Sequence, residues 1–387
     1  MLLHKNVEHD ARVRREARAL HSAGYEVVVV HLPPAGSSVA PAATDGYELR
    51  SATSTGLAGR LPGTLRRSLA AARLARLAAA ERPDVVHAHD AAMLAPGWLA
   101  ARRVAAKLVY DSHELATGVP YRSPAWAALV AAVERAFVSS ADAVITVSDG
   151  IAEHLQSKYL LAERPVVLRN VPDLPPPQES PAPPADLRRE LGVDGAPLIV
   201  HHGAVAKDRG GENLLRALAQ VDQAHLLFLG ANGPYAVGLE ELSRRLKVAP
   251  RTHFEAPVPL DQLLAHAAQA DVGVSLLEPS CENHRLALPN KVFEYVAAGL
   301  PVVVSDLPEL AALVRLYEIG WTVDPRDPAS IAAGLRAAVG AGRNPALRER
   351  LARAAQELSW ERERRRLLDL YARLTGESET PLSGCRA

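Results

Sequence analysis

The chain has 387 residues, 48% of them hydrophobic, which is enough for two domains that each bury a core of ordinary size. Its formal net charge is zero, which argues against a dedicated nucleic-acid-binding protein, because such proteins usually carry a basic balance. The two cysteines, Cys281 and Cys385, form no metal or redox motif and fit a reducing compartment. The amino terminus turns polar after Leu3, unlike a signal peptide, and no apolar run approaches roughly 20 residues, so we expect a cytoplasmic protein.

Short apolar runs alternate with helix-like segments through the first half of the chain. The runs are continuous, as in parallel strands that are covered on both faces. They predict strands at residues 26–32, 85–89, 107–113, 143–148 and 166–170, with helices between them, for example at 11–23 and 124–139. Only residues 1–7 precede the first helix, so we expect a first strand that is clipped or lost to a start codon placed too late.

A proline-rich segment then interrupts the alternation and predicts an interdomain linker at residues 173–186. Strands are again predicted at residues 198–203, 225–230, 272–277, 301–306 and 321–325. The predicted fold class is α/β, with two Rossmann-like, doubly wound parallel-sheet domains facing each other across a cleft. The predicted boundaries are 1–172 for the first domain, 187–358 for the second, 359–375 for a helix that returns to the first domain, and 376–387 for a disordered tail.

Nicotinamide-dependent dehydrogenases are built from similar domains, but they carry the pattern G-x-G-x-x-G after a strand. The nearest approach in this chain is G-A-N-G-P-Y at residues 230–235, where the glycine spacing is wrong. The sequence therefore argues against that class of enzyme.

The most informative segment is L-P-N-K-V-F-E-Y-V-A-A-G-L-P-V-V-V-S-D at residues 288–306. Pro289 suits the first turn of a helix and Gly299 suits its carboxyl end. Lys291 and Glu294 are three residues apart and share one face, where an ordinary surface ion pair would contribute about 0.2–0.5 kcal/mol. The residues expected to form a buried stripe are Phe293, Val296, Ala297 and Leu300.

This segment resembles the donor-binding helix of the retaining glycosyltransferases of group 1, or family 4, in a branch with the form P-N-K-x-F-E-Y. Members of that family adopt the GT-B fold. The resemblance implies that Glu294 holds the ribose of a nucleotide, with Asn290 and Lys291 also on the donor side. A carboxylate suits this task because it accepts hydrogen bonds from both vicinal hydroxyls. Weaker similarity extends the match to residues 10–27, 141–155, 166–173 and 359–374.

The chain departs from the family pattern eight residues before Glu294. The family has a second glutamate there, which contacts the donor sugar, and this chain has Leu286. The identity of the donor sugar therefore stays open. The segment 278–291 is expected to be a loop, which either lies in solvent or supplies replacements from Glu282, Asn283, His284 and Arg285.

A second candidate site lies at residues 201–218, where a strand is followed by a glycine-bearing loop and a helix that begins near Gly211. The first turn of a helix presents free N–H groups and a positive dipole, which suit a phosphate. The resemblance implies that Arg209, directly before Gly210, neutralises the donor diphosphate. The family often has an arginine where this chain has Ala204. Lys207 or Lys291 would supply the missing positive charge, and Gly203 is a further candidate on the donor side.

A third candidate site combines V-V-H-A-H-D at residues 85–90 with V-Y-D-S-H-E-L at residues 109–115. Both segments end predicted strands, and open α/β sheets bind ligands at the carboxyl ends of their strands. The resemblance implies that His113 faces the donor sugar, where it would donate a hydrogen bond or support the transition state electrostatically. Asp90 and Glu114 are candidates for the acceptor side. The alternative is that His113 is a structural residue at a strand end.

Together these sites predict a retaining transfer of a sugar from a nucleotide diphosphate donor to a glycan, a lipid-linked saccharide or a small molecule. Arg209 would stabilise the departing diphosphate, and no D-x-D motif for a metal ion is found, so no metal or other cofactor is expected. Two alternatives remain: a sugar-nucleotide epimerase or hydrolase on the same scaffold, and a non-catalytic binding subunit.

Arginines also occur at helical spacing in residues 65–80, at Arg66, Arg73 and Arg76. A basic amphipathic helix can dock on anionic lipid, which would bring the protein to the inner face of the membrane as a peripheral protein. The alternative is an ordinary surface helix. No nucleic-acid partner is expected.

Overall fold

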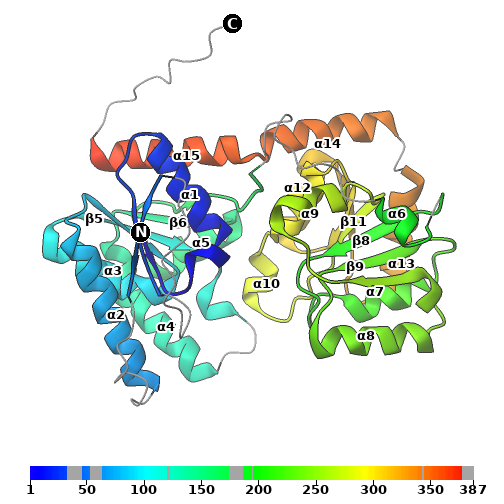
Figure 1. The fold of residues 1–387 in the computed structure, drawn as a ribbon, viewed down its shortest axis with the longest axis horizontal. Helices are drawn as coiled ribbons and strands as arrows, with labels where there is room; N and C mark the ends of the chain where they lie inside the picture. The colour runs from blue at the N-terminus through cyan, green and yellow to red at the C-terminus, as the bar shows by residue number, and fades with distance from the viewer. Residues whose placement is uncertain are drawn as a thin grey trace, which may run out of the picture. The chain divides into compact units, whose positions relative to one another are not determined.

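The computed structural model of the protein describes residues 1–32, 46–52, 63–119, 123–173, 186–193, 195–341 and 344–376. The chain divides into two compact units, one formed by Met1–Arg169 with Glu363–Ala387 and the other by Asn170–Arg362 (Figure 1). Each unit is built on one sheet in which all the paired strands are parallel. The predicted class of two doubly wound parallel sheets is therefore confirmed.

The sheet of the first unit has the strand order β3-β2-β1-β4-β5-β6-β7. Its strands are β1 (Leu2–Leu3), β2 (Val28–His31), β3 (Glu48–Ser51), β4 (Val85–His89), β5 (Lys107–Ser112), β6 (Ala143–Thr146) and β7 (Val166–Val167). The strand that the sequence left in doubt is present: β1 has two residues and lies inside the sheet between β2 and β4, with Leu2 opposite Val30 on one side and Ala88 on the other. The order reverses between β1 and β4, and ligands bind at such a switch point in open α/β sheets.

Helices cover both faces of this sheet, as Figure 1 shows. They are α1 (Ala11–Ser22), α2 (Gly63–Ala80), α3 (Ala91–Val104), α4 (Pro124–Phe137), α5 (Asp149–Tyr159) and most of α15 (Trp360–Thr375). The face of β4 toward α3 is apolar, and a Cβ added at Gly97 would lie 2.8 Å from the Cβ of Ala88. The opposite face of β4 carries His87 and His89, which meet polar residues of α1 and α15. The two faces of one strand thus serve packing and polar chemistry separately.

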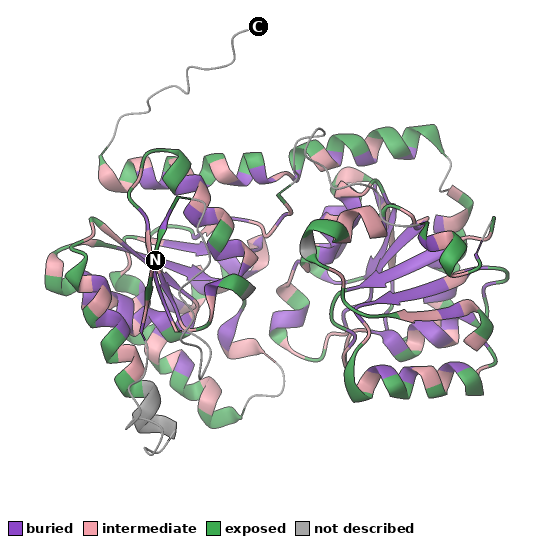
Figure 2. Ribbon diagram, viewed as in Figure 1, coloured by how far each residue is buried: buried purple, intermediate pink, exposed green. Residues whose placement is uncertain are grey.

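The sheet of the second unit has the strand order β10-β9-β8-β11-β12-β13, with the switch point between β8 and β11. Its strands are β8 (Leu198–His202), β9 (His225–Leu229), β10 (Thr252–Glu255), β11 (Val272–Ser275), β12 (Val302–Ser305) and β13 (Gly320–Val323). Its helices are α6 (Leu187–Glu190), α7 (Gly211–Leu218), α8 (Gly233–Arg245), α9 (Leu260–Ala267), α10 (Glu282–Leu286), α11 (Asn290–Ala297), α12 (Pro308–Tyr317), α13 (Pro328–Ala341) and α14 (Pro345–Glu357). Figure 2 shows buried residues along the strands and exposed residues on the outer faces of the helices.

Several predicted features fall partly outside the described residues: 174–185 of the linker, 377–387 of the tail, and the side chain of Arg66. On α2 the side chains of Arg73 and Arg76 are exposed. Within the part of the chain that the structure describes, no helix combines the length and the apolar character needed to cross a membrane.

Candidate functional site

Helix α11 is fixed against the sheet of the second unit by Tyr295. The tyrosine is fully buried, and its hydroxyl accepts a hydrogen bond from the backbone N–H of His202 at 3.0 Å and donates one to the carbonyl oxygen of Val274 at 3.1 Å. A Cβ at Gly273 would lie 2.3 Å from the tyrosine ring, so only glycine leaves room for it. These contacts hold the helix over the carboxyl ends of β8 and β11.

The ends of α11 largely follow the prediction. Gly299 has a φ of +75°, and the bonds from Gly299 N–H to Val296 O at 3.0 Å and from Leu300 N–H to Tyr295 O at 2.9 Å close the helix as a Schellman motif. Two details differ: Pro289 lies just before the first turn rather than in it, and Ala297 is half-buried rather than part of the buried stripe.

Lys291 and Glu294 both lie beside the histidines that end β8. The Nζ of Lys291 is 3.2 Å from the Nε2 of His201, and the Oε2 of Glu294 is 3.4 Å from the Nε2 of His202. Lys291 is only 7% exposed, so the interpretation as a surface ion pair is wrong. Burial, reinforced by the positive charge of Arg209, lowers the pKa of Lys291 to about 7. Burial, followed by the charge of Lys291, lowers the pKa of His202 to about 3.

The loop between β8 and α7 leads to a helix start that no described side chain caps. Gly210 has a φ of +72°, and a Cβ there would lie 2.4 Å from the Cβ of Leu276, so the loop needs glycine at this position. The half-buried Arg209 lowers the pKa of both Lys291 and His284, which places its charge near both. The loop therefore presents a helix amino terminus and an arginine, together with Lys291, to one region.

Other loop positions are less involved. Gly203, Ala204 and Lys207 are exposed, and Asn290 is the exposed first residue of α11. Gly203 lies against Lys291, because a Cβ added to the glycine would be 4.0 Å from the lysine Cε. The side chain of Lys207 is thus more exposed to solvent than that of Lys291, and its role in phosphate binding stays a prediction.

The segment 278–291 was expected to be a loop, and the structure instead forms the five-residue helix α10 within it. His284 is buried, with its Nδ1 3.0 Å from the carbonyl oxygen of Glu278 and 3.1 Å from the hydroxyl of Ser280. Asn283 is also buried, whereas Arg285 is 58% exposed and lies 3.9 Å from the carboxylate of Glu282. Leu286, the departure from the family pattern, is half-buried at the end of α10.

In the first unit, His113 lies just beyond the carboxyl end of β5 and is 15% exposed. Its Nε2 is 3.2 Å from the Oδ2 of Asp111 and 3.1 Å from the Nδ1 of His89, and its Nδ1 is 3.6 Å from the Oδ1 of Asp90. Burial disfavours the imidazolium, but the carboxylates of Asp90 and Asp111 outweigh this and raise the pKa of His113 to about 9. The two carboxylates thus favour the protonated form of His113, the residue for which the family resemblance implies a sugar-facing role.

Asp90 has a strained backbone. Its φ of +66° and ψ of 157° lie in a region that is essentially reserved for glycine, and such strain is concentrated at functional sites. Asp90 lies beside His113 at this edge of the sheet, and its role on the acceptor side stays a prediction. Glu114 is exposed, and its backbone carbonyl accepts a hydrogen bond from Ser112 at 2.8 Å.

The sequence reading missed a buried ionic cluster beneath His113. The Nε and Nη2 of Arg12 donate to the two carboxylate oxygens of Asp111 at 2.8 and 2.9 Å, and Arg12 Nε is 3.0 Å from a carboxylate oxygen of Glu16. His87 stacks on His89, and its Nδ1 is 2.9 Å from the hydroxyl of Tyr371 on α15. The available signals were the i, i+4 spacing of Arg12 and Glu16 and the two histidines on one face of β4.

The atoms of Glu16, His87, His89 and Asp111 that could bind a metal lie within 4.8 Å of one another. Arg12 already supplies a positive charge in this group: it donates hydrogen bonds to Asp111 and lies within ion-pair distance of Glu16. A divalent ion would have to displace the guanidinium or share the carboxylates with it. The donor set therefore fits an internal ion-pair cluster better than a metal site.

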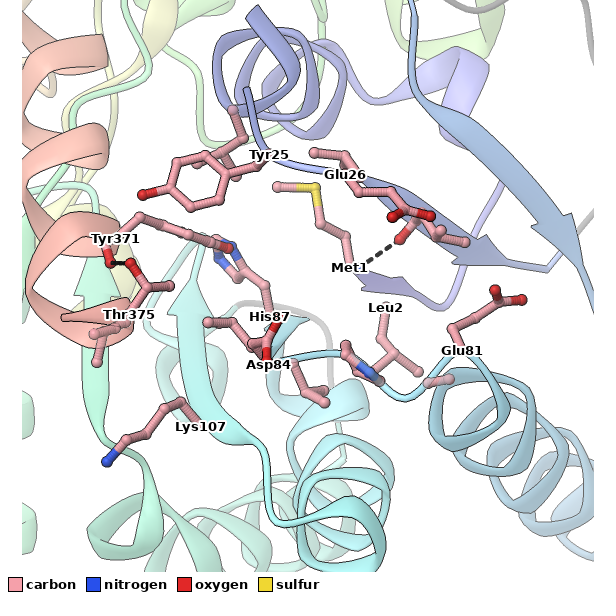
Figure 3. A pocket seen from close by; sticks show the side chains of 18 of the residues that line it. Met1, Leu2, Tyr25, Glu26, Glu81, Asp84, His87, Lys107, Tyr371 and Thr375 are labelled. Carbon is pink, nitrogen blue, oxygen red and sulfur yellow. Dashed lines mark hydrogen bonds between the residues drawn. The ribbon is translucent and has the colours of Figure 1, made fainter. Parts of the chain in front are cut away.

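A cavity of about 620 Å³ lies at the other edge of the same sheet, at the amino ends of its strands (Figure 3). Its lining includes Met1, whose ammonium donates to the carbonyl oxygen of Val28 at 2.7 Å, with Tyr25, Asp84 and Tyr371. The predicted site residues lie at the carboxyl ends of the strands instead. The cavity is therefore separate from the candidate site.

Comparison with known proteins links both units to one family. Residues 9–171 match the model described as Glycosyl transferase 4-like domain, and residues 196–341 match Glycosyl transferases group 1. A D-inositol 3-phosphate glycosyltransferase of Geodermatophilus obscurus is 28% identical over 304 residues, which cover 72% of this chain and 64% of that protein. The chain thus spans slightly less than two thirds of the length of that curated relative.

Solved structures agree at the level of the fold. The sucrose-phosphate synthase of Thermosynechococcus elongatus superposes with a TM-score of 0.74 at 20% identity, covering 97% of this chain and 99% of that one. Anabaena HepE in complex with UDP-glucose gives a TM-score of 0.72 at 17% identity, covering 96% and 98%. The predicted family and its GT-B fold are confirmed, whereas the assignment to the P-N-K-x-F-E-Y branch stays a prediction.

Proposed function

Because the chain belongs to the group 1 glycosyltransferases, we propose that it transfers a sugar from a nucleotide diphosphate donor to an acceptor hydroxyl. The observation that carries this proposal is the convergence of Arg209, Lys291 and Glu294 at the carboxyl end of β8, beside the uncapped start of α7. The two cations suit the negatively charged diphosphate, and the carboxylate suits the hydroxyls of the ribose joined to it.

Each group has a separate task in this proposal. Glu294, whose carboxylate is 18% exposed, accepts hydrogen bonds from the ribose hydroxyls. Arg209 and the first N–H groups of α7 bind the diphosphate, and Gly210 permits the loop conformation that presents them. A uridine diphosphate donor is the first to test, because HepE was solved with UDP-glucose.

We further propose retention of configuration and independence of metal ions. When the bond between the sugar and the diphosphate breaks, negative charge grows on the leaving oxygen, and Arg209 with the α7 dipole stabilises it. The oxygen of the acceptor hydroxyl forms the new bond to the sugar. In this proposal the hydroxyl proton passes to the departing phosphate. His113, held as a cation, donates a hydrogen bond to a sugar hydroxyl.

The acceptor is expected to be a glycan, a lipid-linked saccharide or a small metabolite. D-inositol 3-phosphate is a natural first candidate because the related Geodermatophilus protein is named for it. The experiment is mass spectrometry of products formed from isotope-labelled nucleotide sugars and an acceptor panel. A glycosylated acceptor supports the proposal; an isomerised donor, free sugar alone, or binding without turnover would show an epimerase, a hydrolase or a binding subunit instead.

A further inference from the structure

The surroundings of Lys291 are unusual for a buried amine. The Nζ of Lys291, on α11, lies 3.2 Å from the Nε2 of His201 on β8, so the hydrogen-bond partner of this amine is another base. The charge of Arg209, from the loop after β8, also acts on it. Among the described residues, Glu294 is the one carboxylate that favours its protonation, and the Oε2 of Glu294 lies 3.4 Å from the Nε2 of His202. Arg209 also acts on His284 of α10.

The buried pair of Lys291 and His201 has little negative charge beside it. Burial with the charge of Lys291 keeps the pKa of His201 well below its ordinary value, although a hydrogen bond with the backbone of Ala204 acts in the opposite direction. Two buried bases, Lys291 and His201, therefore lie near a guanidinium, and the carboxylate that acts on Lys291 is itself partly exposed to solvent. A bound anion would restore the balance.

We infer that Lys291 is the second cation of the diphosphate site and that it takes up a proton when the nucleotide diphosphate binds. This rests on the proposed function, since the anion is the diphosphate of the donor or product. The position fits: the Lys291 stem lies against Gly203, where the phosphate-binding loop begins, and the chain has the uncharged Ala204 next to that glycine. Lys207, the alternative cation, is exposed.

The sign of the effect follows from linkage. With a pKa of about 7 in the free protein, Lys291 is a neutral amine in roughly nine-tenths of molecules at pH 8. A diphosphate beside it favours the ammonium and raises this pKa, so binding at pH 8 consumes up to about 0.9 proton. Affinity then falls as the pH rises above 7, by up to about tenfold per pH unit, until the pKa of the complex is reached.

The test is isothermal titration calorimetry with UDP, ADP and GDP at pH 8, in buffers of different ionisation enthalpy. At this pH the terminal phosphate of the nucleotide, whose pKa is about 6, is already ionised, so the nucleotide itself contributes little to the measured proton uptake. We expect the wild-type protein to take up between about 0.5 and 0.9 proton per bound nucleotide. Lys291→Arg should bind with an uptake below about 0.1, because arginine is always charged.

Two further variants complete the design. Lys291→Met should weaken nucleotide binding at pH 7 by at least about tenfold, and Lys207→Met, which removes the exposed lysine of the same loop, should behave like the wild type. Proton uptake that persists in Lys291→Arg would assign the proton to His201 or His202 and overturn the inference. Nucleotide binding without any uptake would overturn it while leaving the donor site intact. If none of the nucleotides binds at any pH, the donor-site assignment itself fails.

Discussion

The two units treat a buried positive charge in opposite ways. His113 in the first unit lies near two carboxylates, and its pKa rises to about 9 although burial acts against it. Lys291 in the second unit meets bases and a guanidinium, and its pKa falls to about 7. The penalty of burial is common to both, so the difference lies in the countercharges that the fold provides. The surroundings of His113 already contain countercharges, whereas those of Lys291 would gain one from the proposed anion.

Removing a countercharge from the first unit should have the largest effect. Asp111→Asn leaves Arg12 and His113 without their shared carboxylate, and breaking a buried ion pair costs about 3–5 kcal/mol. Urea unfolding should show this loss. Asp142→Asn, which removes the exposed partner of Lys107, should cost less than about 1 kcal/mol. Equal stabilities for the two variants would contradict the idea of a balanced cluster.

Arg209→Met tests the cation of the second unit in catalysis. Loss of one group that stabilises the leaving diphosphate should reduce kcat about 10²–10³-fold, with little change in unfolding free energy. Steady-state kinetics with the donor found in the product screen provide the measurement. Arg244→Met, at an exposed position on α8, is the matched control. A variant with unchanged kcat would remove Arg209 from the mechanism.

The pH dependence of stability should have opposite slopes for the two cations. The pKa of His113 is raised from 6.5, so the contribution of His113 to stability is complete below pH 6.5 and is lost as the pH rises to 9. Over this range the stability of the wild type relative to His113→Gln should fall by about 3 kcal/mol. The pKa of Lys291 is lowered from 10.5, so the stability of the wild type relative to Lys291→Met should rise between pH 7 and 9 by about 2–3 kcal/mol. Urea titrations at a series of pH values measure both; slopes of the same sign would refute the comparison.

Glu294→Gln should give a smaller effect that is confined to binding. Hydrogen bonds to charged groups contribute about 1.5–3 kcal/mol, so nucleotide affinity should fall roughly 10- to 150-fold. Glu282→Gln, on the exposed side of α10, should keep the wild-type affinity in the same calorimetric assay. If Glu294→Gln also keeps it, the ribose is held elsewhere.

The smallest expected effect is that of chelation. Because Arg12 occupies the cluster of Glu16, His87, His89 and Asp111, EDTA should change neither the transfer rate nor the melting temperature. Added Zn²⁺ should likewise leave the melting temperature unchanged. A rise in melting temperature with stoichiometric Zn²⁺ would show that the metal displaces the guanidinium.

The sequence predicted the fold well where the physics is local. Continuous apolar runs identified most of the parallel strands, but β3 and β10 are short and contain charged residues, so their sheet pairing could not be read from hydrophobicity. Helix α10 has five residues, fewer than two turns, and gives no periodic signal.

The candidate site was predicted less evenly. Gly299 was found because a helix end restricts the residue type, and Gly210 was found through the family resemblance; the structure gives both a positive φ. The burial of Lys291 was missed because it depends on His201, 90 positions away. The cluster around Arg12 was missed for the same reason: its partner Asp111 is 99 positions distant, and charged residues on a helix ordinarily face solvent.

Helix α15 has a consequence for biosynthesis. Its Tyr371 completes the buried surroundings of His87, yet the ribosome makes it only after the whole second unit. At about 5–20 residues per second, the first unit waits roughly 10–40 s on the ribosome for its last piece. During that interval the nascent first unit carries an unfinished polar core, which makes it a natural client for chaperones while the second unit folds.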